Sequence, residues 1–302
     1  MRLISHTVQY QNTDDVFTLY HLTDLHIGAA ACDEKLLRQD IQRIAADPSA
    51  RWIGGGDYLD AIARKGDKRY MEDTLAPWLR GKNDVVGQQR DYAADLLSPI
   101  AGKCLGLIKG NHESAVEKYN DRAIYHELVR IIAQAAGKED SELALGVHGY
   151  INLSFQYLAA NSTGHGWRMT IYTHHGFGGG GMPGAHALTL GRILGRYECD
   201  LALMGHRHVG QHLSTPYVKA LNKSVIEQNR VAMFVPSYLN WRIIPSNGTN
   251  RPVDTYSEEH GMGPVPLGTT PVVVEPFKRN FSLIVSNNPE SSLVDRIARR
   301  SA

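Results

Sequence analysis

Short apolar segments alternate with longer amphipathic ones along most of the chain. Residues 16–23 are mainly β-branched, aromatic or aliphatic, and 104–108 form a second short apolar run, as is typical of strands. After Asp33, an expected N-cap, apolar positions recur at helical spacing until Asp47-Pro48 ends the helix. By the same criteria we expect further strands over 52–53, 150–159, 167–173, 200–204, 209–215, 231–235, 271–274 and 281–285, and further helices over 68–80, 87–98, 121–135, 185–197 and 290–300.

This order of elements predicts a layered fold. Strands alternate with helices in the first half and dominate the second half, which indicates an α/β or α+β sandwich. Residues 245–270 are rich in Pro, Gly, Ser, Thr and Asn, so we expect a long loop there. We therefore predict a main domain over 1–245 and a C-terminal extension over 246–302 that packs on the same domain. The glycine-rich segment Gly176–Gly184 either contacts a substrate or only connects two elements.

Composition and charge narrow the class of protein. Of the 302 residues, 42% are hydrophobic and 21% charged, and the formal net charge is +1. So small a charge gives no global attraction to nucleic acid or anionic membranes. The basic cluster 64–69 is expected to be a solvated loop, with a nucleic-acid patch as the alternative.

The sequence predicts a cytoplasmic protein that does not contact membranes. Its three scattered cysteines indicate reduced thiols rather than a disulfide framework. The N-terminus lacks the apolar region of a signal peptide. No apolar run reaches the roughly 20 residues that cross a bilayer.

Polar clusters that suit metal binding stand where five of the expected strands end. They read Asp24-Leu25-His26, Gly55-Gly56-Asp57, Gly110-Asn111-His112-Glu113, Thr173-His174-His175-Gly176 and Gly205-His206-Arg207-His208. Because ligands of open α/β sheets gather beyond the carboxyl ends of the strands, we expect these clusters to share one pocket. The side chains expected to reach it are Asp24, His26, Asp57, Asn111, His174, His206 and His208.

Such a set of donors favours two metal ions. Oxygen and nitrogen ligands without a thiolate suit Mn, Fe or Zn. Seven ligands with one bridging carboxylate are enough for two metals about 3.5–4 Å apart, an arrangement used to hydrolyse phosphate esters. Each cluster alone has a plainer interpretation, since an aspartate after glycines is often only a turn residue and a lone His-x-His is often a surface or core feature. The five together favour the metal site.

The ordered motifs Asp-x-His, Gly-Asp, Gly-Asn-His-Glu, His-His and Gly-His-x-His resemble those of the calcineurin-like metallophosphoesterase superfamily, over residues 17–240. The resemblance implies a four-layer αββα sandwich of two mixed β-sheets flanked by helices. It also implies two divalent metal ions, for which we expect manganese, with Fe, Zn, Ni and Co as alternatives. The implied ligands are Asp24, His26 and His208 for one metal, Asn111, His174 and His206 for the other, and Asp57 as the bridge.

The resemblance also suggests roles for the remaining site residues. His112 resembles the family histidine that contacts the scissile phosphate and protonates the leaving oxygen. Glu113 is expected to orient His112, as carboxylates beside an active site often do. The family places the ligand at the first histidine of the His-His pair, so we prefer His174 to His175, which we expect to be structural or to support a ligand.

The implied activity is hydrolysis of a phosphate ester by a hydroxide held between the metals, with no covalent enzyme intermediate. We lean to a phosphodiester, such as a nucleotide or nucleic acid, because Gly-Asn-His-Glu and Gly-His-x-His resemble the phosphodiesterase and repair-exonuclease branches. A phosphomonoesterase acting on a phosphoprotein or a small metabolite is the alternative. A non-catalytic, metal-stabilised scaffold is a third hypothesis, and a homodimer is a further expectation.

Overall fold

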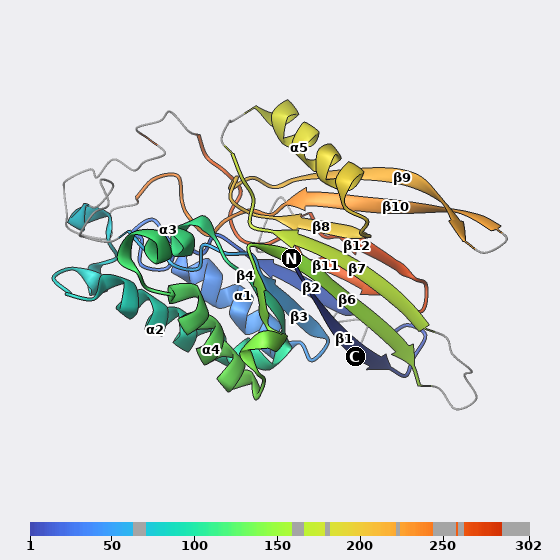
Figure 1. Ribbon diagram of the computed structural model, residues 1–302, viewed down its shortest axis with the longest axis horizontal. Coiled ribbons are helices and arrows are strands. Elements are labelled where there is room, and N and C mark those ends of the chain that lie inside the picture. The colour runs from blue at the N-terminus through green and yellow to red at the C-terminus, as the bar shows by residue number, and fades with distance from the viewer. Residues whose placement is uncertain are drawn as a thin grey trace.

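Two mixed β-sheets form the centre of the computed structural model (Figure 1), which describes residues 1–62, 71–158, 166–178, 182–221, 224–243, 258 and 263–285. Sheet A has the strand order β1-β6-β7-β8-β10-β9, and sheet B has the order β12-β11-β2-β3-β4-β5. The strands of sheet A are β1 (Arg2–Tyr10), β6 (His148–Tyr157), β7 (Gly166–His174), β8 (Leu201–Met204), β9 (Gln211–Leu221) and β10 (Ser224–Phe234). Those of sheet B are β2 (Phe17–Leu22), β3 (Ala50–Gly54), β4 (Cys104–Ile108), β5 (Ala144–Gly146), β11 (Val272–Glu275) and β12 (Asn280–Leu283).

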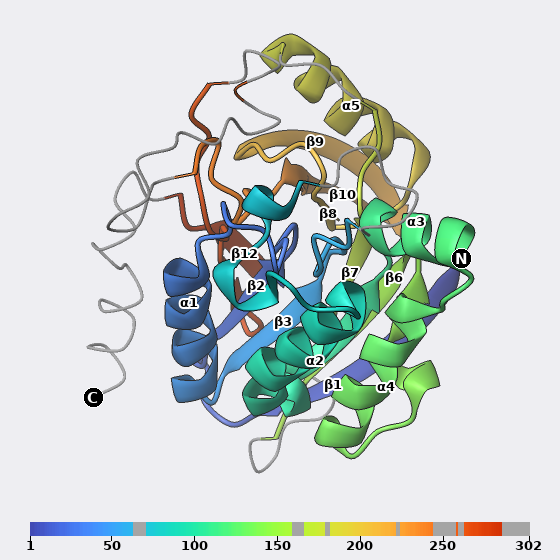
Figure 2. The ribbon, with the colours of Figure 1, turned by 90° about the vertical axis from the view of Figure 1, so that its left-hand side faces the viewer.

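Helices cover the outer faces of both sheets (Figures 1 and 2). They are α1 (Glu34–Ala46), α2 (Val85–Leu97), α3 (Asn111–Asn120), α4 (Ile124–Ala136) and α5 (Pro183–Arg196), with short 3₁₀ turns at Glu72–Thr74, Pro77–Leu79, Ser98–Lys103 and Asp140–Glu142. Helices α1, α2 and α4 share one apolar cluster with the outer face of sheet B. Helix α5 packs on the outer face of sheet A. A separate cluster fills the space between the two sheets, with side chains from both.

The predicted fold class is therefore confirmed. Helix, sheet, sheet and helix form four layers, and each sheet combines parallel and antiparallel pairs. The order of strands and helices also agrees with the sequence pattern over most of the chain. At α1, the expected N-cap Asp33 accepts a hydrogen bond from the backbone N–H of Leu36 at 3.0 Å.

Some predicted elements differ from the structure. The prediction of a helix over 68–80 is wrong. Residues 72–79 hold only two short 3₁₀ turns separated by extended residues. Pro77 has no backbone N–H to donate, so a continuous helix cannot pass through it without losing a hydrogen bond. Strands β1 and β5 and helix α3 were not predicted. The basic cluster 64–69, the helix expected over 290–300 and most of the loop expected over 245–270 lie outside the described residues.

The last described strands complete sheet B. Strand β11 pairs antiparallel with β2, and β12 pairs with β11. Val272 and Val274 of β11 are each 1% exposed and belong to the cluster between the sheets. Thus residues beyond 245 contribute to the central core.

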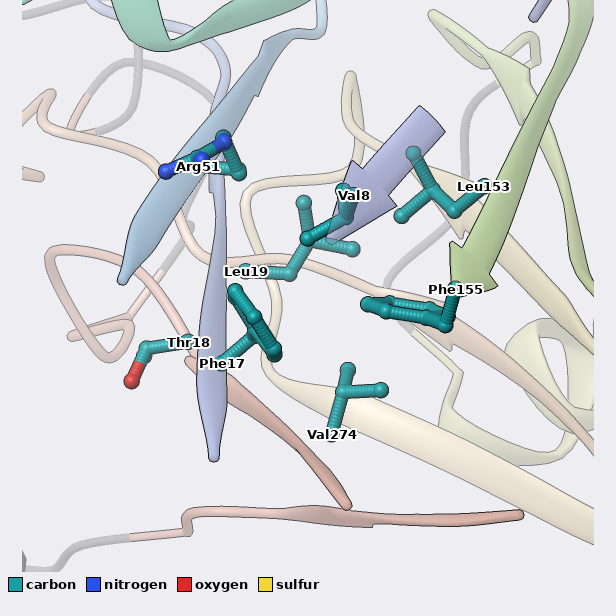
Figure 3. A pocket seen from close by; sticks show the side chains of 8 residues that line it. All are labelled: Val8, Phe17, Thr18, Leu19, Arg51, Leu153, Phe155 and Val274. Carbon is teal, nitrogen blue, oxygen red and sulfur yellow. The ribbon is translucent and has the colours of Figure 1, made fainter. Parts of the chain in front are cut away.

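A small apolar cavity lies between the sheets, away from the strand ends that carry the polar clusters (Figure 3). It is lined by Val8, Phe17, Thr18, Leu19, Arg51, Leu153, Phe155 and Val274. Six of these eight residues are apolar, so we assign the cavity to the core rather than to a functional site. In the part of the chain that the structure describes, no helix has the length and apolar character needed to span a bilayer.

Candidate metal centre

The loops that carry the five polar clusters are joined by hydrogen bonds at the carboxyl ends of their strands. Strands β2, β3 and β4 are parallel neighbours in sheet B, and β7 and β8 are parallel neighbours in sheet A. Asp24 N donates to Gly56 O at 2.9 Å, and His26 N donates to Asp57 O at 3.1 Å. Across the sandwich, His206 N donates to the two carboxylate oxygens of Asp24 at 3.0 and 2.9 Å. These bonds hold loops of both sheets around one pocket.

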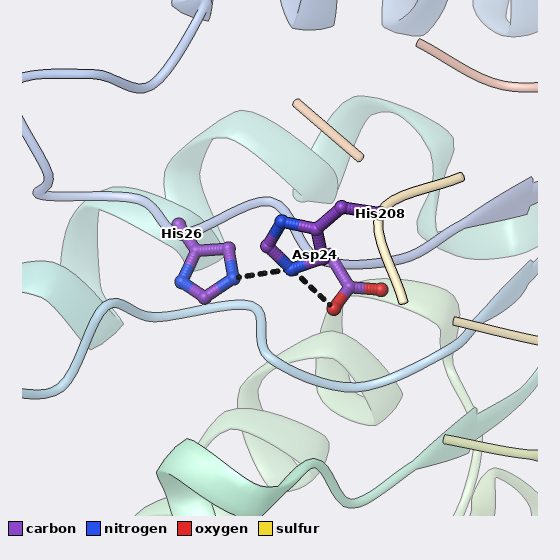
Figure 4. A group of neighbouring side chains, drawn as sticks. All are labelled: Asp24, His26 and His208. Atoms are coloured by element: carbon purple, nitrogen blue, oxygen red, sulfur yellow. Dashed lines mark hydrogen bonds and ion pairs between the residues drawn. The ribbon is translucent and has the colours of Figure 1, made fainter. Parts of the chain in front are cut away.

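Asp24, His26 and His208 form a first group of converging side chains (Figure 4). His208 Nε2 lies 3.1 Å from Asp24 Oδ1 and 3.4 Å from His26 Nε2. Asp24 is fully buried, and His26 is 3% exposed. The hydroxyl of Thr23 donates to Asp24 Oδ2 at 2.6 Å, which fixes the orientation of the carboxylate. Three donor atoms thus face one another, two of them on buried residues and the third on His208, whose side chain is 26% exposed.

The spacing of these atoms fits a divalent cation. Metal–nitrogen bonds of about 2.0–2.1 Å at angles of about 90–110° place ligand atoms about 3.0–3.4 Å apart. Both distances measured from His208 fall in this range. Facing imidazole nitrogens need a proton or a cation between them, and the buried carboxylate beside them favours the positive charge. A set of oxygen and nitrogen donors without sulfur suits Mn, Fe or Zn.

Asp57, His175 and His206 form a second group. His175 Nε2 lies 3.1 Å from Asp57 Oδ2 and 2.9 Å from Asn111 Oδ1. On the other side of the ring, His175 Nδ1 donates to Gly55 O at 2.8 Å. A histidine that donates from one nitrogen to a carbonyl directs its other nitrogen at a metal, a common arrangement in metalloproteins. Two oxygens facing Nε2 require a positive charge there, either a proton or a metal ion.

The sequence analysis preferred His174 to His175 as the ligand, and the structure places His175 in the second group and His174 outside both groups. Side chains alternate along β7, so His174 shares the outer face of sheet A with Tyr172, which packs under α5. The ring of His174 contacts His148 and Phe177, with centroid separations of 5.7 Å to each. His175, one position later, points into the space between the sheets.

His112 stands beside both groups. Its Nε2 lies 3.9 Å from Asp57 Oδ2, and its Nδ1 donates to the backbone carbonyl of Asp60. The carboxylate of Asp60 in turn lies 3.4 Å from His26 Nδ1. Asp60 was missed by the sequence analysis, although its position three residues after Asp57 places a second carboxylate on the same loop. With Nδ1 held in this way, Nε2 of His112 is the nitrogen that faces the pocket.

Glu113, which the sequence analysis expected to orient His112, binds backbone groups in the structure. Its fully buried carboxylate accepts hydrogen bonds from the backbone N–H groups of Asp57 at 3.0 Å, Leu59 at 3.2 Å and Gly110 at 3.0 Å. Burial and the nearby Asp57 carboxylate raise the pKa of Glu113 to about 7. Glu113 therefore ties the loop after β3 to the start of α3, whereas the carbonyl of Asp60 holds the His112 ring.

Charge in the pocket favours a cation. Burial raises the pKa of Asp24 and of Asp57, but the nearby His175 and its neighbouring histidines lower both by more, so each pKa lies well below its usual range. Against the effect of burial, the two carboxylates raise the pKa of His175 to about 10. At neutral pH a proton on His175 thus supplies part of the positive charge that the two buried carboxylates require, and a bound cation would replace it.

Comparisons with known proteins do not establish the activity of this chain. No protein-family model and no curated protein matches the chain. Among solved structures, the chain is similar to the crystal structure of a metallophosphoesterase from Sphaerobacter thermophilus, with 11% sequence identity, over 94% of this chain and 95% of that one. The TM-score is 0.35, and a likeness at this TM-score and identity says nothing about what the pocket does.

Proposed function

We propose that the chain is a phosphoesterase that uses two divalent metal ions. The observation that carries the proposal is the convergence of two sets of metal-binding side chains on one pocket, Asp24, His26 and His208 in one and Asp57, His175 and His206 in the other. Asn111, whose Oδ1 lies beside His175 Nε2, would complete the second set, and Asp57 would bridge. The resemblance of the five motifs to calcineurin-like metallophosphoesterases supports the same interpretation.

The residues around the two groups suit phosphate chemistry. When bound, two divalent cations would supply an activated water and offset the charge of the phosphate. Nε2 of His112 faces the pocket and is positioned to donate a proton to a leaving oxygen, because the Asp60 carbonyl holds Nδ1. Helix α3 begins at Asn111, so its positive N-terminal end also favours an anion at this point.

For the substrate we favour a phosphodiester, and for the metal manganese. A phosphomonoesterase remains the alternative activity. A non-catalytic scaffold fits less well, since a scaffold has no need of His112 held with one nitrogen facing the metal groups. A homodimer and a cytoplasmic location stay predictions.

The test compares two substrates on protein reloaded with Mn²⁺: bis(p-nitrophenyl) phosphate and p-nitrophenyl phosphate. We expect two manganese ions per chain and faster turnover of the diester. Asp57→Asn should lower turnover by more than about 100-fold, because loss of even a supporting group at a metal site costs about 10–100-fold. His212→Ala is the matched control, since His212 is exposed on β9 and stands outside both groups.

The outcomes separate the three hypotheses. Diester turnover that is lost in Asp57→Asn and retained in His212→Ala supports the phosphodiesterase. Preference for the monoester would favour the alternative activity. Bound manganese with no turnover of either substrate would count against catalysis and favour the scaffold.

A further inference from the structure

Phe177 exposes an aromatic ring next to the candidate metal ligands. Its side chain is 51% exposed, although it follows β7 by only three residues. The preceding residue, Gly176, has a φ of +124° and packs against His206, because a Cβ added to Gly176 would lie 2.6 Å from His206 Cβ. The ring therefore stands one residue from backbone that contacts a candidate ligand.

The backbone on both sides of this ring is held in place. Gly176 N donates to His174 Nδ1 at 2.7 Å. Arg207, which lies between His206 and His208, donates from Nε to Phe177 O at 3.1 Å. Exposed apolar side chains at single positions are common on protein surfaces, but here hydrogen bonds hold the backbone that carries one of them beside a polar pocket.

Other rings support Phe177 from behind. Its ring contacts His174 at an interplanar angle of 80°, and His174 contacts His148 at 72°. His148 Nδ1 lies 3.1 Å from the hydroxyl of Tyr172, which is fully buried. A row of rings thus runs from Tyr172, beneath α5 on the outer face of sheet A, through His148 and His174 to the exposed ring of Phe177.

We propose that Phe177 stacks on the base of a nucleotide phosphodiester whose phosphate lies at the two metal groups. This inference rests on the proposed function and specifies its substrate class. Proteins that bind nucleotides without reading their sequence combine an exposed aromatic ring with nearby positive charge, because every base presents a π face. Phe177 supplies the ring, and Arg207 supplies a cation in contact with the same turn.

The experiment uses two diesters with the same leaving group, thymidine 5′-(p-nitrophenyl phosphate) and methyl p-nitrophenyl phosphate, on the Mn²⁺-loaded protein. The ratio of their kcat/KM values isolates the contribution of the nucleoside. Phe177→Leu keeps apolar bulk but removes the π ring, and it should lower this ratio about 5- to 150-fold, mainly through KM. Phe177→Trp should keep or raise the ratio. Leu188→Ala, an exposed position on α5, is the control and should keep the wild-type ratio.

A binding measurement covers the case of failed turnover. In Phe177→Trp, thymidine 5′-monophosphate should quench the new indole emission beyond the signal of the four native tryptophans in the wild type. Both esters hydrolysed with the same ratio in wild type and Phe177→Leu would overturn the stacking role and leave the phosphoesterase standing. If neither ester is hydrolysed, the phosphoesterase fails, and the quench decides the stacking role: saturable quenching supports it, and its absence overturns it.

Discussion

Five candidate ligands have a positive φ, a backbone conformation that is rare for residues other than glycine. Among the described residues, eight that are not glycine have a positive φ, and five of these are the candidate ligands Asp24, His26, Asp57, His206 and His208. Each such residue costs about 1 kcal/mol or more, so the five together cost about 5 kcal/mol, as much as the whole stability of many domains. Strain concentrated in one pocket is typical of positions kept for binding or catalysis.

We predict that His175, and not His174, holds a metal ion. In protein reloaded with Mn²⁺ and dialysed, His175→Ala should retain about one metal fewer per chain than the wild type, because Asp57 and Asn111 lose the nitrogen between them. His174→Ala should keep the wild-type metal content, since its ring lies on the outer face of sheet A. Metal analysis by mass spectrometry measures both. The opposite pattern would restore His174 as the ligand.

The choice between these two histidines shows where sequence reasoning reached its limit. The sequence was sufficient to locate the His-His cluster at the end of a strand. It could not decide which histidine faces the pocket, because α5 buries the outer face of β7 and residues of both faces are apolar. Similarly, the role of Glu113 depends on where the backbone of Asp57 and Leu59 lies, and sequence spacing does not show this.

At the scale of elements, the pocket depends on close approach between loops of the two sheets. Strand β8 ends at Met204, and the next residue, Gly205, passes directly over the loop that follows β2. A Cβ added to Gly205 would lie 2.1 Å from Thr23 Oγ1 and 2.2 Å from Asp24 Oδ2. Because Gly205 has no side chain, the two loops can approach closely enough for His206 and His208 to contact Asp24.

Gly205→Ala should accordingly displace the Asp24 carboxylate and disrupt the first metal group. We expect lower Mn²⁺ content and a loss of about 1–3 kcal/mol of unfolding free energy, as for other overpacked sites. The matched control is Gly195→Ala on α5, where an added Cβ meets nothing within 4 Å. That change should stabilise the helix by about 0.5–1 kcal/mol and leave metal binding intact. Equal Mn²⁺ content in both variants would contradict this prediction, because it would show that the loops can move apart while the first metal group still binds its ion.

The success of the prediction followed the strength of the apolar pattern at several elements. Strand β4 is buried along its whole length and was recognised as a strand. Strand β1 is an edge strand that mixes Arg2, Ser5 and His6 with apolar residues, so its pattern is weak. Helix α3 buries only Glu113 and Val116, and its hydrophobic signal is correspondingly small. Tertiary contacts, rather than local pattern, establish both elements.

At the scale of the whole molecule, the core that supports the pocket includes residues from both ends of the chain. Strand β11 pairs with β2, and β2 leads directly to Asp24. Val8 of β1 and Val274 of β11 line the same cavity between the sheets (Figure 3). A change at residue 274 therefore acts on the packing of both sheets, although it lies beyond the predicted boundary at 245.

Val274 offers a test of this shared core with two opposite changes. Val274→Ala should enlarge the cavity and cost about 2–3 kcal/mol of unfolding free energy, since the side chain is 1% exposed. Val274→Ile adds one methylene next to existing empty space and should gain up to about 0.8 kcal/mol. Urea unfolding, followed by both tryptophan fluorescence and circular dichroism, measures the shifts. Both probes should move together, because Trp52 lies in sheet B, Trp167 lies in sheet A, and Val274 packs between the sheets. Transitions that do not coincide would mean that unfolding is not two-state and would contradict a single cooperative core.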